Sequence, residues 1–199
     1  MRRFVILGHK ANTDGSFKLN DMAGGAGRLD ILLRCINSAF FLSHGIRRDV
    51  EVYLILLGPP NPPVTIKLSG SEIRYLNPDE RSTGSLIRNA LLKMKDRDEI
   101  SSSPGIYASR MGLEEVILSM KDTQIIYLHE NGIEMEEMDF QAGKDLTFVL
   151  GDHMDLSEEE ERILEKYGAL KASLGPEILH ADHCIVVSHN ILDKKAKLK

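Results

Sequence analysis

Three segments in the second half of the chain each combine an apolar, strand-like run with a glycine and polar side chains. They are Ile125–Leu128 followed by His129-Glu130-Asn131-Gly132, Phe148–Leu150 followed by Gly151-Asp152-His153, and 172–183, which contains Gly175 and precedes Cys184–Val187. Ligands of open α/β sheets bind beyond the carboxyl ends of the strands, and glycine lets a ligand approach the backbone closely. Any one of these glycines is more simply explained as a turn. Three such segments in one half of a sheet predict a cofactor pocket.

Sequence motifs for other kinds of site are weak or missing. The run 24–28 (Gly-Gly-Ala-Gly-Arg) is too compact for a dinucleotide-binding loop, and the chain has no P-loop motif. It also lacks the Gly-x-Ser-x-Gly turn of many hydrolases. His180 and His183 lie close together with Asp182, but no further ligands follow at a convincing spacing, so we expect no metal site.

An alternation of strands and helices should position these segments. β-Branched runs predict strands at Phe4–Leu7, Val50–Leu57, Val64–Leu68, Ile73–Leu76, Gln124–Leu128, Thr147–Leu150 and Cys184–Val187. Helical spacing of apolar residues or a capping box predicts helices over 29–40, 87–94, 113–120 and 157–167, with a last helix from Asn190 into the tail Lys194–Lys199. We therefore expect an α/β fold with a mainly parallel sheet and helices on both faces.

One domain should span the whole chain, residues 1–199, because no shift in composition marks a second one. A chain of this length can bury a core without disulfides or metals. Turns at 58–63 and 69–71 separate short apolar runs. They predict a small antiparallel insertion near 58–76.

The composition is that of an ordinary globular protein, with 42% hydrophobic and 28% charged residues. No apolar run is long enough to cross a membrane, and the apolar stretch after Met1 ends too soon for a signal peptide. Cys35 and Cys184 are far apart and match no zinc spacing, so we expect a cytoplasmic protein with reduced thiols.

The net charge of −5 does not favour a generic nucleic-acid binder. Its distribution is uneven: residues 1–100 carry 15 Lys and Arg against 11 Asp and Glu, a balance of +4, and the remainder carries 10 against 19, a balance of −9. A basic first half can form a local phosphate-binding patch in an acidic protein. Taken alone, however, the asymmetry is more simply a property of a solvated surface.

The sequence resembles the archaeal tRNA pseudouridine-54 N1-methyltransferases of the SPOUT superfamily over nearly its whole length. The similar segments are Gly27–Cys35 with Ser43–Arg47, Leu128–Gly132 with Gly151–His153, and Leu174-Gly175 with Leu179–Ile185. A weaker resemblance reaches the ribosomal pseudouridine N1-methyltransferases. It lies in Arg28-Leu29-Asp30 and in Asn77–Arg81, with Arg88 one helix face further on.

This resemblance implies a deep trefoil knot at the C-terminus, a rare exception to unknotted chains. It implies a homodimer with a shared site that uses S-adenosylmethionine to methylate N1 of pseudouridine 54 in tRNA. The cofactor would lie bent in the knot, held largely by backbone groups. The residues that match the family's cofactor loops are Leu128, Gly151, Leu174, Gly175, Leu179 and Cys184.

Methylation of pseudouridine at N1 needs no covalent intermediate, so the enzyme must supply orientation and a proton acceptor. Arg28 would hold the RNA while Asp30 polarises N1–H or positions Arg28. A structural role for Asp30 at a helix start is equally compatible with the sequence, and both roles stay open. Arg47, Arg81 and Arg88 suit contacts with RNA phosphates. Cys184 is disfavoured as a catalyst, because a buried cysteine usually acts as a small hydrophobe.

Three other functions remain compatible with the sequence. A protein of this fold could bind RNA as a ribosome or tRNA assembly factor, or methylate a ribosomal pseudouridine. An enzyme acting on a small nucleotide is a third class. Cofactor binding without methyl transfer to any RNA would favour the assembly factor.

Overall fold

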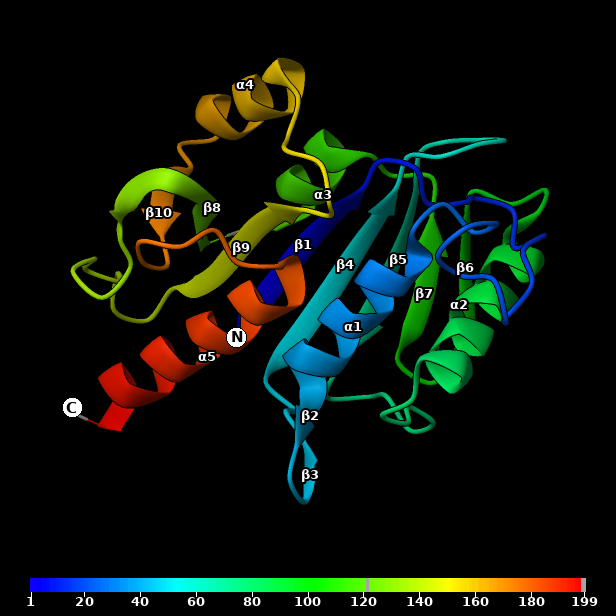
Figure 1. Ribbon diagram of the computed structural model, residues 1–199, viewed down its shortest axis with the longest axis horizontal. Helices are drawn as coiled ribbons and strands as arrows, with labels where there is room; N and C mark the ends of the chain where they lie inside the picture. The colour runs from blue at the N-terminus through cyan, green and yellow to red at the C-terminus, as the bar shows by residue number, and fades with distance from the viewer. Residues whose placement is uncertain (121, 198–199) are drawn as a thin grey trace.

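A mixed eight-stranded sheet forms the centre of the protein, and the computed structural model describes residues 1–120 and 122–197. The sheet has the strand order β10-β8-β9-β1-β4-β5-β7-β6 (Figure 1). Its strands are β1 Arg2–Gly8, β4 Val50–Leu56, β5 Val64–Ser69, β6 Glu99–Ser103, β7 Ile106–Ser109, β8 Thr123–Glu134, β9 Asp145–Gly151 and β10 Leu170–Ser173. The helices are α1 Leu29–Phe40, α2 Glu80–Met94, α3 Leu113–Ser119, α4 Glu158–Lys166 and α5 Ala181–Lys197, and β2 Phe41–Leu42 pairs with β3 Gly45–Ile46 in a separate hairpin.

The first strand lies near the centre of the sheet and divides its two halves. β1 pairs in parallel with β4 on one side and with β9 on the other, and β8 and β10 continue the parallel half. Beyond β4, the strands β5, β7 and β6 pair antiparallel. The predicted α/β fold with a mostly parallel central sheet is confirmed. The antiparallel segment expected near 58–76 corresponds to β5, which extends the main sheet directly from β4.

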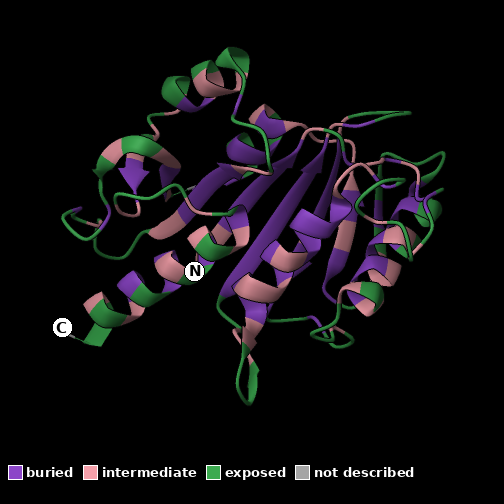
Figure 2. Ribbon diagram, in the orientation of Figure 1, coloured by how far each residue is buried: buried purple, intermediate pink, exposed green. Residues whose placement is uncertain are grey.

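Helices cover both faces of the sheet, as predicted, because successive residues of the central strands point to opposite sides. Phe4 and Ile6 of β1 belong to the core under α1, α2 and α5, whereas Val5 and Leu7 belong to the core under α3 and α4. All four side chains are fully buried. Figure 2 shows the central strands buried along most of their length, while the tip of the β2–β3 hairpin is exposed.

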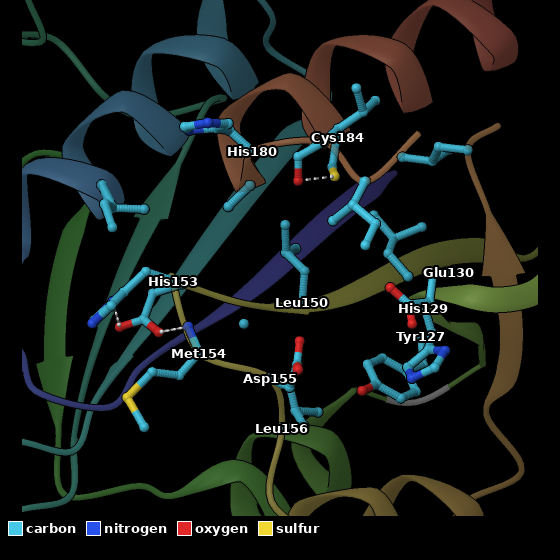
Figure 3. Close-up of a pocket in the computed structure, with 18 of the residues that line it drawn as sticks. Tyr127, His129, Glu130, Leu150, His153, Met154, Asp155, Leu156, His180 and Cys184 are labelled. Atoms are coloured by element: carbon cyan, nitrogen blue, oxygen red, sulfur yellow. Dashed lines mark hydrogen bonds and ion pairs between the residues drawn. The ribbon is translucent and has the colours of Figure 1, made fainter. Parts of the chain in front are cut away.

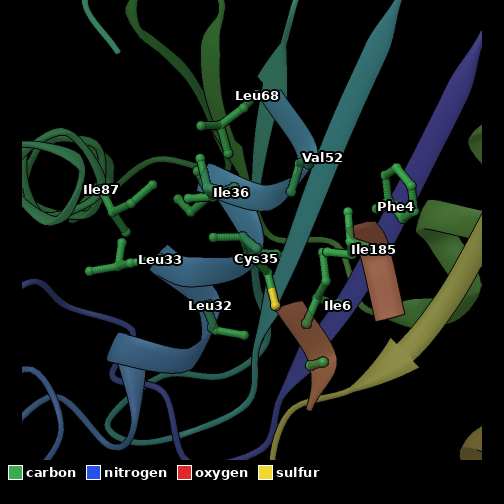
Figure 4. Packing of buried hydrophobic residues seen from close by; sticks show 14 of the residues in the cluster. Phe4, Ile6, Leu32, Leu33, Cys35, Ile36, Val52, Leu68, Ile87 and Ile185 are labelled. Atoms are coloured by element: carbon green, nitrogen blue, oxygen red, sulfur yellow. The ribbon is translucent and has the colours of Figure 1, made fainter. Parts of the chain in front are cut away.

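The helix α1 lies between α2 and α5 on one face of the sheet. Its apolar stripe, which predicted the helix, includes Leu32, Leu33 and Ile36, all fully buried. In Figure 4, Leu33 faces Ile87 of α2, and the thiol of Cys35 points toward α5. The packing of α1 against α5 and the sheet holds the start of each helix at the same edge.

The C-terminal region corrects one prediction. Cys184–Val187 was expected as a strand but lies inside α5, which begins at Ala181 rather than near Asn190. A short apolar run fits a buried helix as well as a strand. The buried residues follow the helical period instead, and they are Ala181, Ile185, Ser188, His189, Ile191 and Leu192. Positions 198–199 of the predicted basic tail lie outside the described residues.

A polar contact fixes α5 to the sheet and to α1. The His189 ring accepts a hydrogen bond at Nδ1 from Arg2 (3.0 Å) and donates one from Nε2 to the carbonyl of Ala39 (3.1 Å). This pattern requires the neutral ring. Burial, together with the nearby charges of Arg47 and Arg2, lowers the pKa of His189 to about 4.

The segment Ile73–Leu76, also predicted as a strand, is irregular chain with a bend at Tyr75 instead. The backbone N–H of Ile73 donates to the carbonyl of Ser69, and the Arg48 side chain donates to the carbonyl of Ile73. Neither backbone group of Ile73 therefore pairs with a neighbouring strand. The short strands β6, β7 and β10 were not predicted, because polar residues interrupt their apolar pattern. Within the described residues no helix is long and apolar enough to span a membrane.

Candidate cofactor pocket

A cavity of about 450 Å³ lies where β9 and β10 end and where the pairing of β8 with β9 stops at Tyr127, beside the beginnings of α1 and α5. His129–Gly132, expected to follow the strand, lie within β8, which continues to Glu134. Its walls come from 127–130 within β8, 150–156 at the end of β9, and residues of 172–181 at the end of β10, with Arg28, Ile31 and Arg34 at the start of α1. In Figure 3, His180 and Cys184 approach the cavity from the α5 side, Met154 and Asp155 lie opposite them, and Tyr127 stands to one side. The three glycine-containing segments singled out in the sequence therefore meet at one cavity.

All six residues predicted to bind the cofactor line this cavity. They are Leu128, Gly151, Leu174, Gly175, Leu179 and Cys184. Arg28 lines it too, whereas Asp30 lies just behind Arg28 and not in the wall. The cavity wall combines apolar leucines with carboxylates, among them Glu130 and Asp155.

Gly151 ends β9 at the cavity, where the chain turns back on itself. A Cβ atom added there would lie 2.3 Å from the carbonyl oxygen of Met154, well inside van der Waals contact. The close turn brings the backbone of 151–156 to the surface of the cavity. A glycine is therefore required by the backbone of the segment itself.

We expect Gly151→Val to displace this segment and to weaken binding of S-adenosylmethionine at least about tenfold. The overpacked side chain should lower the free energy of unfolding by about 1–3 kcal/mol, which leaves the fold intact. Titration calorimetry measures the affinity, and circular dichroism checks the fold. Gly45→Val is a matched control, because a Cβ at Gly45 of the β2–β3 hairpin meets no atom within 4 Å. Unchanged cofactor binding by the Gly151 variant would refute the assignment.

The segment after β10 has a different requirement for glycine. Gly175 has φ +124°, a conformation that side chains rarely adopt, and a Cβ there would meet open space. Its backbone is tied to Ser173, whose hydroxyl donates to the carbonyl of Gly175 at 3.1 Å. The wall is thus held in a shape that leaves free room beside the backbone.

The cysteines do not form a nucleophilic site. Cys184 starts no strand but lies in the first turn of α5, with its Sγ 3.8 Å from the carbonyl of Leu179. Burial raises the pKa of Cys184 to about 11, and stronger burial raises the pKa of Cys35 further. Both are thiols at neutral pH, and a thiol is a weak nucleophile.

Asp30 holds two arginines at the mouth of the cavity. Its carboxylate accepts bonds from Arg28 (Nε, 3.1 Å) and from Arg34 one helical turn later (Nη1, 3.1 Å). Burial opposes ionisation of Asp30, but the bonds from Arg28 and Arg34 outweigh it and lower the pKa of the carboxyl. With its oxygens occupied by two guanidinium groups, Asp30 is poorly placed to accept a further proton.

The backbone at Arg28 is strained in a way that aims its side chain. Arg28 has φ 65°, the left-handed region that a side chain rarely adopts. The preceding Gly27 has the same φ and packs so tightly on the carbonyl of Lys10 that a Cβ would overlap it. The glycine run 24–27, which matched no nucleotide motif, thus shapes the turn that presents Arg28 to the cavity.

The three arginines predicted to contact RNA lie apart from one another. Arg47 precedes β4, at the opposite edge of the sheet from the cavity, and pairs with Asp193 of α5 at 2.6 Å. Arg88 of α2 donates to the carbonyl of Gly15 at 3.2 Å. Arg81 is exposed in the first turn of α2.

Sequence reasoning missed Arg34, His9 and the role of Asp152. Arg34 lines the cavity four residues after Asp30, a spacing that places both on one helix face and was a usable signal. His9 lies 143 residues from its partner Asp152, so no local pattern could reveal that contact. The Asp152 side chain is almost fully buried and joins the end of β9 to the end of β1.

Comparison with known proteins gives a consistent assignment. A family model described as SAM-dependent RNA methyltransferase matches residues 1–197. A protein of Methanococcoides burtonii named tRNA (pseudouridine(54)-N(1))-methyltransferase is 49% identical over 196 residues, covering 98% of this chain and 96% of the relative. A protein of the same name from Methanocella arvoryzae is 48% identical over 98% of this chain and 100% of its own length.

The fold is similar to that of a solved structure. The crystal structure of Archaeoglobus fulgidus Nep1 bound to S-adenosylhomocysteine superimposes with a TM-score of 0.65 at 17% sequence identity. The superposition covers 96% of this chain and 97% of Nep1.

Proposed function

The chain belongs to the family of SAM-dependent RNA methyltransferases, and we propose that it transfers a methyl group from S-adenosylmethionine to N1 of pseudouridine 54 in tRNA. The observation that carries the substrate is the 49% identity, over nearly the whole of both chains, to a protein named for that reaction. The cavity at the carboxyl ends of β9 and β10 is the proposed place for it.

The residues of the cavity fit S-adenosylmethionine. The open space beside Gly175 leaves the backbone accessible to a ligand, and leucine side chains offer apolar surface for an adenine ring. Glu130 and Asp155 supply negative charge for a ligand with sulfonium and ammonium groups. We propose that Leu128, Gly151, Leu174, Gly175, Leu179 and Cys184 hold the cofactor.

When bound, the cofactor supplies an electrophilic methyl group to a nucleophile in line with its sulfonium. The N1 nitrogen of pseudouridine becomes that nucleophile when its N–H proton is released to solvent. Arg28 stands at the mouth of the cavity, and a guanidinium close to N1 favours the deprotonated base. We therefore assign Arg28 as the catalytic residue and Asp30 as the positioning residue that fixes Arg28 and Arg34.

The positive groups at the cavity mouth are the proposed contacts to the tRNA backbone, together with exposed Arg81. Arg47 lies at the opposite edge of the sheet from the cavity, and Arg88 donates to the carbonyl of Gly15, so neither is carried into this proposal. We expect Arg34→Gln with Arg81→Gln to lower the salt slope of tRNA binding by roughly one for each lost phosphate contact.

Arg47→Gln is the matched control for that measurement and should leave the salt slope unchanged, although it removes the pair with Asp193. Filter binding of tRNA at several salt concentrations gives the slopes. A slope that changes for Arg47→Gln but not for the double variant would place the RNA at the other edge of the sheet.

We further propose a homodimer formed through the surface around α5. Exposed apolar side chains lie at the cavity and on α5: Ile178 and Met154 line the cavity and are 79% and 42% exposed, and Val186 is exposed on α5. Large apolar side chains around a site commonly mark an interface. Static light scattering at micromolar concentration should give the mass of two chains, and a mass of one chain would contradict the dimer.

The family resemblance also leads us to propose a trefoil knot over the segment that includes β10 and α5, and a cytoplasmic location. The packing supports the knot: α5 follows the edge strand β10, yet its buried face lies against α1 and the centre of the sheet. Tracing residues 172–197 in an experimental map would test it.

Methyl mapping in tRNA tests the proposed function in the cell. Mass spectrometry of tRNA from a strain that lacks this protein should show pseudouridine at position 54 in place of N1-methylpseudouridine. Expression of the protein should restore the methyl group. An unchanged tRNA, with a lost methyl group on ribosomal RNA, would favour the ribosomal methyltransferase instead.

A further inference from the structure

His9 lies directly after β1 and outside the cavity wall, yet it contacts two carboxylates that hold the ends of a segment of that wall. Its Nδ1 lies 3.1 Å from Oδ1 of Asp152, and its Nε2 lies 3.2 Å from Oε2 of Glu160. Its backbone N–H also donates to Oδ2 of Asp152 at 3.1 Å. The carboxylates come from the end of β9 and from the first turn of α4.

The geometry identifies the charge of the ring. Both nitrogens of His9 face carboxylate oxygens, which only accept hydrogen bonds, so both must donate. Only the imidazolium form has two N–H donors. A neutral ring would leave one nitrogen lone pair facing a carboxylate inside the protein, since the side chains of His9, Asp152 and Glu160 are all mostly buried.

The two carboxylates anchor the segment 151–157 at its two ends. Asp152 also accepts from the backbone N–H of Met154 at 3.0 Å and lies 3.3 Å from Nδ1 of His153. Glu160 also accepts from the backbone N–H of Ser157 at 2.7 Å, in the predicted capping box of α4. Residues 151–156 between these anchors line the cavity.

We propose that protonated His9 is a positioning residue for the cofactor, because it joins the two ends of the segment 151–157 and so holds that wall of the cavity in its binding shape. The inference rests on the proposed function only in taking S-adenosylmethionine as the ligand. His9 does not line the cavity, so it acts through Asp152 and Glu160.

The protonation of His9 sets the pH range of this effect. The charged groups facing the ring are Asp152 and Glu160, with His153 on the far side of Asp152. Hydrogen bonds to Asp152 and then Glu160 outweigh burial and raise the pKa of His9 to about 9. The contribution of protonated His9, bonded to Asp152 and Glu160, is therefore fully present at pH 6.5 and is lost as the pH rises through about 9.

The test compares the affinity for S-adenosylhomocysteine in the native protein and in His9→Gln, by calorimetry at pH 7 and pH 10. At pH 7 the variant should bind about tenfold more weakly, the scale of a lost charge-assisted hydrogen bond. At pH 10 the ratio of the two affinities should fall toward one, because the native ring is then neutral. Any titration of the ligand cancels in this ratio.

A purely structural His9 would give a ratio that does not change with pH, and that result would overturn the proposal. His44→Gln, on the exposed tip of the β2–β3 hairpin, is the matched control and should bind as the native protein does at both pH values. If the native protein fails to bind S-adenosylhomocysteine at any pH, the proposed function itself fails.

Glu160→Gln supplies a second variant that keeps the capping box, since glutamine serves at that position as glutamate does. Its amide oxygen still accepts from His9, but the negative charge is gone. The pH at which S-adenosylhomocysteine affinity declines should therefore move to a lower value than in the native protein. A midpoint that stays in place would contradict the role assigned to the His9 imidazolium.

Discussion

Replacing Asp30 with asparagine should slow methyl transfer to tRNA by about 10²-fold, the cost of a reacting group displaced by about 1 Å, while cofactor affinity stays unchanged. The carboxylate of Asp30 holds Arg28 at 3.1 Å and Arg34 at 3.1 Å. An asparagine oxygen can accept a bond from one of these groups, but its amide would repel the other donor. Arg28 would then lose the orientation that aims it at the base.

The measurement is single-turnover methyl transfer with saturating tRNA and cofactor, together with calorimetry of cofactor binding. Asp96→Asn, an exposed aspartate in the turn after α2, makes the same substitution as a control and should transfer at the native rate. Asp30→Glu, which keeps the charge, should recover part of the lost rate.

The pH dependence separates positioning from general-base catalysis by Asp30. The lowered pKa of Asp30 keeps it ionised through the neutral range. If Asp30 itself accepted the proton, its removal would cost up to about 10⁴-fold and would abolish an acidic limb of the rate profile. A native rate in Asp30→Asn would remove Asp30 from the mechanism altogether.

The sequence was sufficient to predict β1, β4, β8 and β9 of the parallel half of the sheet, but not its edge strand β10. β1, β4 and β9 are buried on both faces, and such strands read as short continuous apolar runs. Gly151 follows a predicted parallel strand, whereas Gly175 follows the unpredicted β10 and was assigned to the cofactor site through the resemblance to a known family. The resemblance to a known family supplied what periodicity could not, the chemistry of the ligand.

The misassigned and missed features depend on contacts distant in sequence. The run Cys184–Val187 is helical because α5 buries one stripe of side chains against α1, and four apolar residues alone do not distinguish that from a strand. Arg47, predicted for RNA, pairs with Asp193 at the far end of the chain. His9 gains its role only when β1 and β9 lie side by side.

The chemical nature of the target atom is the central claim, and it predicts an all-or-none dependence on pseudouridine. Pseudouridine has a nitrogen with a proton at the ring position where uridine has its bond to the sugar. At the edge where pseudouridine presents N1–H, uridine presents the ring carbon C5. Methylation of C5 ordinarily needs a covalent nucleophile to activate the ring. Cys184 and Cys35 are the thiols of the chain, and burial raises the pKa of both, so neither supplies one.

The most direct measurement compares two tRNAs of identical sequence, one transcribed with uridine at position 54 and one first isomerised to pseudouridine at that position. Incubation with the protein and S-adenosylmethionine labelled in its methyl group, followed by mass spectrometry of the nucleosides, identifies the product. We predict N1-methylpseudouridine from the isomerised tRNA and no methylated nucleoside from the other. Robust methylation of the tRNA that lacks pseudouridine would contradict the nitrogen target and the mechanism built on it.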